Sequence, residues 1–168
     1  MTDVYANMKK IILITSLALI SFISFGQTHL LVTQQEAEKI LGRPAHLSAD
    51  STETMDHIVQ YRCTYTANDM EIDKDKQSNL YYMFEEYASR SDAEKSFKRL
   101  MSQNAGMEGL YPLKSVGDEA FIHSDTDHFQ LIIARKSEKI IRMKVNKVTK
   151  TTSIEELKRV TKKITDQL

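Results

Sequence analysis

Residues 129–134 and 141–145 form the pattern that most limits how this chain can fold. Apolar side chains recur at every second position, as with Phe129, Leu131 and Ile133, and a short polar turn separates the two segments. A period of two is typical of β-strands, and two such strands joined by a short turn pair as an antiparallel hairpin. The sequence therefore predicts a hairpin near its C-terminal end.

Two earlier segments, residues 58–66 and 80–87, alternate in the same way and place Tyr61, Tyr82 and Phe84 on their apolar sides. They predict a second hairpin, with a long charged loop between its strands. Residues 45–56 are polar and aperiodic, so we expect a loop or a weak edge strand there.

Three helix starts are indicated by a serine or threonine followed three residues later by glutamate, the capping-box pattern. The pairs are Thr33 with Glu36, Ser91 with Glu94, and Ser153 with Glu156. Apolar residues at helical spacing follow each pair. The order of elements predicts an α+β fold, an antiparallel sheet of about five strands with the helices packed on one face.

The N-terminal segment has the pattern of a secretory signal peptide. Residues 11–25 contain no charge and follow Lys9 and Lys10, and small residues stand at Ser24 and Gly26. These features predict residues 1–26 as a signal peptide, with cleavage before Gln27 and translation starting at Met8. Retention of this segment as an anchor is the alternative. The remaining 27–168 are expected to form a single domain.

The protein is predicted to be periplasmic or secreted, with no membrane span after cleavage of the signal peptide. The chain has a single cysteine, Cys63, which excludes an intramolecular disulfide, so stability has to come from packing. No cysteine directly follows the apolar run, so the lipid attachment signal of bacterial lipoproteins is missing. Cys63 lies on the aromatic side of a predicted strand, which favours a small buried residue over a nucleophile.

Charge is distributed unevenly although the net charge is zero. Residues 50–94 contain eleven acidic and four basic residues, whereas residues 135–163 contain eleven basic and three acidic. Such asymmetry is found in surfaces for anionic partners, but it also arises where two halves of a domain lie side by side and neutralise each other.

Residues 123–128 hold the densest group of metal-ligating side chains, two imidazoles and two carboxylates. Such ligands could hold a zinc or another divalent ion, and we list His123, Asp125, Asp127 and His128 as candidate ligands. The same residue types are also typical of an ordinary turn between strands, because their side chains bond to nearby backbone.

A basic surface is the second candidate. The predicted C-terminal helix has one cationic face, and the preceding hairpin adds further positive side chains; the candidates are Arg142, Lys144, Lys158 and Lys162. They could attract phosphates of lipid headgroups. Aromatic side chains, which stack on bases, do not alternate with these basic residues. This pattern and the predicted export of the protein argue against a nucleic-acid partner.

Residues 115–122 read Ser-Val-Gly-Asp-Glu-Ala-Phe-Ile, and residues 36–42 read Glu-Ala-Glu-Lys-Ile-Leu-Gly. With the strand pair that follows, these segments resemble small exported bacterial α+β domains of unknown function, in which a Val-Gly-Asp-Glu-Ala-Phe turn precedes strands carrying Arg-Lys-Gly. Ser137 stands where that glycine would be. The resemblance implies an α+β sandwich and no assigned activity.

No nucleophile elbow, phosphate-binding glycine loop or zinc-protease helix motif occurs in the sequence, so an enzyme is disfavoured and no cofactor is expected. The sequence favours an exported, non-enzymatic binding or interaction module that contacts an unknown protein or envelope component. The alternative is a divalent metal-binding protein or hydrolase that uses residues 123–128. The oligomeric state is left open.

Overall fold

The structure is a computed structural model that describes residues 32–68, 77–125 and 128–168. The predicted signal peptide, residues 1–26, lies outside the described residues. In the described part of the chain, no helix is both long and apolar enough to cross a membrane.

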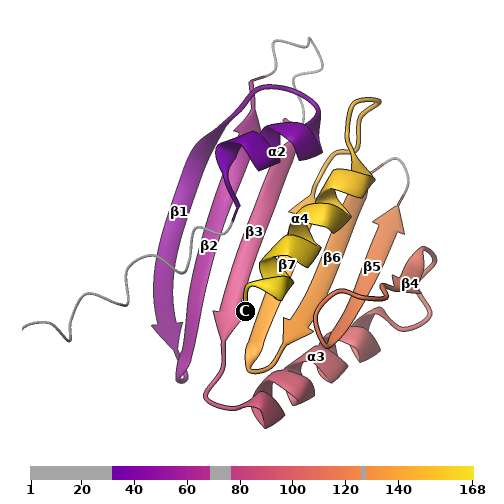
Figure 1. Ribbon diagram of the computed structural model, residues 1–168. Helices are drawn as coiled ribbons and strands as arrows, with labels where there is room; N and C mark the ends of the chain where they lie inside the picture. The colour runs from indigo at the N-terminus through magenta and orange to yellow at the C-terminus, as the bar shows by residue number, and fades with distance from the viewer. Residues whose placement is uncertain (1–31, 69–76, 126–127) are drawn as a thin grey trace, which may run out of the picture. The chain divides into compact units, whose positions relative to one another are not determined.

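Seven strands form one antiparallel sheet in the described residues, in the order β1-β2-β3-β7-β6-β5-β4 (Figure 1). The predicted number of about five strands is therefore too low. The strands are β1 (Ala45–Met55), β2 (Ile58–Ala67), β3 (Asn79–Glu86), β4 (Leu110–Pro112), β5 (Glu119–Asp125), β6 (Phe129–Lys136) and β7 (Lys139–Val145).

Three helices occur in the described residues, α2 (Gln34–Leu41), α3 (Arg90–Asn104) and α4 (Ile154–Asp166). The capping box of Thr33 and Glu36 is confirmed, and the Ser153 hydroxyl accepts a hydrogen bond from the Glu156 N–H as predicted. The prediction for α3 is wrong by two residues. Its N-cap is Ser89, whose hydroxyl accepts from the Asp92 N–H, so the helix begins before Ser91.

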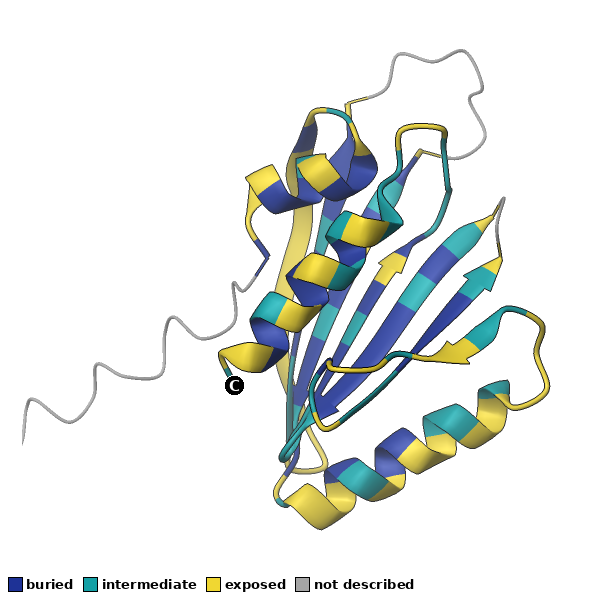
Figure 2. Ribbon diagram, turned by 45° about the vertical axis from the view of Figure 1, so that its right-hand side comes forward, coloured by how far each residue is buried: buried dark blue, intermediate teal, exposed yellow. Residues whose placement is uncertain are grey.

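The prediction that all helices pack on one face of the sheet is wrong. Alternate residues of the central strands separate into two clusters. Ile132 and Met143 pack with residues of α2 and α4, whereas Ile133 and Ile140 pack with Phe97 of α3. Helices α2 and α4 therefore cover one face, called here the α4 face, and α3 lies against the opposite α3 face (Figures 1 and 2).

Strand β1 is an edge strand, and every residue after Ala45 in it is exposed (Figure 2). Its turn into β2 contains Asp56 and His57, both with positive φ, of 52° and 64°. Two such residues are typical of a tight hairpin turn whose twist matches that of the strands. Of the two expectations for residues 45–56, a loop or a weak edge strand, the structure shows the edge strand.

Candidate functional site

A cleft of about 590 Å³ lies where the segment after α3 approaches the ends of β5 and β6. It is called the His123 cleft. Its walls combine apolar, acidic and imidazole side chains, and those that matter here are Met107, Glu108, Tyr111, His123, Asp125 and Phe129. The volume falls in the range of small-molecule pockets, about 300–1,000 Å³.

Gly109 brings the segment after α3 close enough to form one wall of the cleft. Its φ is +80°, and its carbonyl accepts a hydrogen bond of 2.9 Å from the Ser124 N–H. A Cβ at this position would lie 1.9 Å from the Ser124 carbonyl oxygen. Only glycine allows this approach, because it lacks a Cβ and readily adopts positive φ.

His123 is the most unusual polar residue of the cleft. It lies on β5 between Leu131 and Leu110 in the strand register, and only 9% of its surface is exposed. Its ring meets the Phe129 ring edge-on, with centroids 5.0 Å apart. Within the described residues its imidazole makes no hydrogen bond. Its ring nitrogens are not among the fully buried polar atoms that lack a partner, so they are open to the cleft. One of them can therefore bond a molecule inside the cleft.

Two carboxylates give the cleft its charge. Asp125 Oδ2 is 3.0 Å from Nδ1 of His128, and both of these side chains are exposed. Glu108 has no hydrogen-bond or ion-pair partner among the described residues. The part of the chain that the structure describes places no lysine or arginine in the cleft lining.

The predicted metal ligands are only partly brought together. His123 and Asp125 line the cleft, His128 bonds to Asp125 from the exposed side, and Asp127 lies outside the described residues. Among the residues that are described, no three histidine, cysteine, aspartate or glutamate side chains converge to hold a metal ion.

The four predicted basic residues do not form one surface. Arg142 and Lys144 extend from β7 on the α3 face, while Lys158 and Lys162 belong to α4 on the other side of the sheet. Arg142 pairs with Glu85 at 2.7 Å, Lys158 with Glu155 at 3.0 Å, and Lys162 with Asp166 at 2.8 Å. Lys144 differs, because its Nζ lies 5.0 Å from the centre of the Phe129 ring and no described carboxylate pairs with it.

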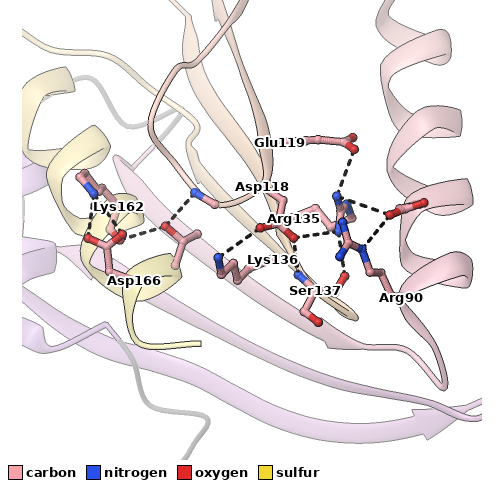
Figure 3. Close-up of polar contacts among 11 residues, drawn as sticks. Arg90, Asp118, Glu119, Arg135, Lys136, Ser137, Lys162 and Asp166 are labelled. Carbon is pink, nitrogen blue, oxygen red and sulfur yellow. Dashed lines mark hydrogen bonds and ion pairs between the residues drawn. The ribbon is translucent and has the colours of Figure 1, made fainter.

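A second polar cluster surrounds Arg135 of β6, which is 1% exposed (Figure 3). Its Nη1 donates to Asp118 Oδ2 at 3.1 Å and to the Ser137 carbonyl at 2.9 Å, and its Nη2 donates to Glu119 Oε1 at 3.0 Å. Asp118 also accepts from the Ser137 N–H at 2.9 Å. That backbone hydrogen bond, together with Lys136 and Arg135, outweighs the effect of burial and lowers the pKa of Asp118.

Gly117 holds this cluster against the sheet. Its φ is +59°, and a Cβ there would lie 2.4 Å from the Arg135 carbonyl oxygen. The Asp118 N–H donates to that same oxygen at 2.8 Å. The Gly-Asp-Glu part of residues 115–122 therefore has a structural role, since it fixes a buried arginine at the end of a hairpin, and its charged groups bond to one another.

Cys63 is buried on β2, as predicted. Burial raises the pKa of its thiol to about 11, with the Asp50 carboxylate adding to the rise, although a hydrogen bond with Tyr61 opposes it. The residue is therefore protonated at neutral pH, and its nucleophilic thiolate form is scarce.

Sequence reasoning identified His123 and Asp125 but missed the rest of the cleft. The sequence assigns no role to residues 106–109, and it predicts Phe129 only as part of a strand. It offers one signal for that wall of the cleft, the glycine at 109, and no pattern that places Glu108 and Tyr111 in the cleft.

Comparison with known proteins gives no match to a protein-family model, a curated protein or a solved structure. The resemblance stated for residues 115–122 stays a prediction.

Proposed function

We propose that this protein is an exported, non-enzymatic binding module, and that its ligand site is the His123 cleft. The observation that carries the proposal is a histidine that is 9% exposed, lines an open cleft and has no hydrogen-bond partner in the described residues. A ring nitrogen open to the cleft can bond a ligand in place of water, and such a bond contributes about 0.5–1.5 kcal/mol to affinity.

Export is supported by the sequence of residues 8–26, with Lys9 and Lys10 before the uncharged run and small residues before Gln27. N-terminal sequencing of the protein recovered from its host tests this part. An N-terminus at Gln27 in an extracytoplasmic fraction is expected, and a cytoplasmic protein that retains residues 8–26 would contradict it.

The site is tested by NMR of the histidine rings in the ¹⁵N-labelled full chain, during titration with a fragment panel of amines, alcohols, carboxylates and sugars. We expect at least one fragment to shift the His123 ring signals in a saturable way. His46 serves as an internal control, because it lies on the remote edge strand β1 and bonds to Asn68.

A variant, His123→Phe, keeps an aromatic ring against Phe129 and removes both ring nitrogens. It is expected to fold and to bind the same fragment more weakly, by loss of about one hydrogen bond or five- to tenfold in affinity. A panel that leaves the His123 signals unmoved would refute the proposal. Saturable zinc binding that shifts His123 and His128 together would favour the metal-binding alternative.

A further inference from the structure

We infer that the His123 cleft selects a ligand in which an ammonium or guanidinium group is joined to an apolar group. This inference rests on the proposed function above and adds the chemical class of the ligand. Three independent features of the cleft support it: its charge, its aromatic walls and its buried imidazole.

The charge of the cleft is negative and is only weakly compensated. Other carboxylates on this side of the sheet are used by the protein itself, since Glu85 pairs with Arg142 and Asp118 with Arg135. Glu108, by contrast, has no partner among the described residues, and within them Asp125 bonds only to the exposed His128. The Lys144 ammonium lies near the Phe129 ring of the same cleft and compensates part of this negative charge. An anionic ligand would meet like charge here, whereas a cation would meet two carboxylates.

The apolar part of the cleft is unusually exposed. Tyr111 is 61% exposed and Met107 is 50% exposed, and Phe129 lines the same cleft. Aromatic faces attract cations, and they also provide apolar contact for a hydrocarbon group. The protein already shows this contact, since the Lys144 ammonium lies 5.0 Å from the centre of the Phe129 ring.

The imidazole of His123 supplies the directional element. One ring nitrogen of a neutral imidazole accepts a hydrogen bond, and ammonium and guanidinium groups are donors only. The imidazole can therefore accept a hydrogen bond from such a cation, and the two carboxylates of the same lining favour the cation over a neutral donor by charge.

The test compares three probes of similar size on the full chain, 2-phenylethylamine, 2-phenylethanol and phenylacetate, with the His123 ring signals as the readout. We expect the amine to bind several-fold more tightly than the alcohol, and the carboxylate to bind least. The affinity for the amine should also fall as NaCl is raised, because exposed charge pairs are screened. A blocked peptide containing one lysine distinguishes a lysine side chain from a free amine as the source of the cation.

The matched variants are Glu108→Gln in the cleft and Glu155→Gln on α4, where the carboxylate pairs with Lys158 far from the cleft. Glu108→Gln is expected to weaken amine binding by about two- to fivefold, the range for a partly exposed charge pair, and to leave alcohol binding unchanged. Glu155→Gln should change neither.

Two failures can be told apart. Alcohol or carboxylate binding at His123 that equals or exceeds amine binding would overturn the assigned ligand class and leave the binding function standing. If the wider fragment panel also leaves the His123 signals unmoved, the binding function itself fails.

Discussion

Arg135 shows how one buried charge can be held by a hairpin turn. Its guanidinium reaches two carboxylates and a carbonyl oxygen within 3.1 Å, while 1% of the residue is exposed. A buried charge is tolerated only when its partners are in place, and removing one partner leaves the others to lose their bonds. The stability of this corner of the sheet therefore depends on the whole set.

Replacing Arg135 with methionine is expected to lower the free energy of unfolding by about 3 kcal/mol, because Asp118 and Glu119 lose a buried partner. Urea denaturation followed by circular dichroism measures the change. Arg159→Met is the control, since Arg159 is exposed and pairs with Glu156 on α4, away from the Arg135 cluster, and such surface pairs contribute little to stability. Equal effects of the two substitutions would contradict the buried role of Arg135.

Gly117 and Gly106 provide a matched comparison of backbone strain with steric overlap. Both have positive φ, of 59° and 82°, but a Cβ at 117 would overlap the Arg135 carbonyl, whereas the space at 106 is open. Gly106→Ala should cost about 1 kcal/mol for the backbone conformation alone, and Gly117→Ala at least about 1 kcal/mol more. The two midpoints of urea unfolding give the difference, and similar midpoints would show that the corner can relax.

The residues of the cleft illustrate what sequence alone provides at this scale. His123 and Asp125 stand out by residue type, so they could be selected without a structure. Glu108 and Tyr111 could not, because they reach the cleft only through the pairing of β4 with β5, which sets Leu110 opposite His123. A three-residue strand containing a proline has too little pattern to predict that register.

At the scale of elements, α3 and α4 contact the same central strands from opposite sides. Phe97 of α3 lies 5.7 Å from Phe121, ring centre to ring centre, and Leu157 of α4 is wholly buried on the other face. Residues in contact have coupled effects on stability, and residues separated by a sheet do not.

A double-mutant cycle tests this arrangement. Phe97→Leu, Phe121→Leu and Leu157→Ala are each expected to lower the unfolding free energy by about 1–3 kcal/mol. Phe97→Leu and Phe121→Leu should deviate from additivity by at least about 0.5 kcal/mol, while Phe97→Leu and Leu157→Ala should add. Strong coupling of the second pair would place both helices on one face.

Alternation predicted the existence of β2 and β3, because each has one face in a core cluster and repeats its apolar residues accordingly. It also predicted β6 and β7, although both of their faces contribute to core clusters, as Ile132 and Ile133 show. Strand β1 lacked that signal, since an edge strand exposed on both faces has no apolar side to repeat. The side of the sheet that α3 occupies could not be predicted from the sequence either. Periodicity identifies the apolar stripe of a helix, but a connection after β3 can lead to either face.

At the scale of the whole molecule, the uneven charge of the sequence becomes a pattern of neutralisation. The acidic early part and the basic late part meet along the β3–β7 ladder, where Glu85 pairs with Arg142 at 2.7 Å and Glu86 lies 3.4 Å from Lys139. Glu36 of α2 pairs with Lys163 of α4 at 3.0 Å. These pairs fit the expectation that the acidic and basic halves lie side by side and neutralise each other.

The hydrogen bonds and ion pairs of these carboxylates make the stability of the protein depend on pH. Burial alone would raise the pKa of Glu36, but hydrogen bonds from the Thr33 N–H and from Lys163 lower it below the ordinary 4.5. Hydrogen bonds from Lys139 and Ser137 lower the pKa of Glu138 to about 2. A carboxyl group with a depressed pKa in the folded state stabilises the protein above its unfolded pKa and loses that contribution as pH falls.

We therefore expect the urea midpoint to be steady from about pH 7 to 5 and to decrease between about pH 5 and 2, as the carboxylates are protonated. Glu138→Gln should make the decrease shallower, because it removes one of the titrating groups. A midpoint that rises on acidification through this range would contradict these pKa directions.

The strand order also determines when the sheet can be completed during synthesis of the chain. Neighbouring strands of the sheet follow one another in the chain, with one exception in the described residues, the pairing of β3 with β7. Since a chain is made from its N-terminus, the apolar residues Leu80, Tyr82 and Phe84 have no partner on one side until β7 has been added. Completion of the sheet is therefore a late event of synthesis, and the β3 edge stays open to other chains until β7 arrives.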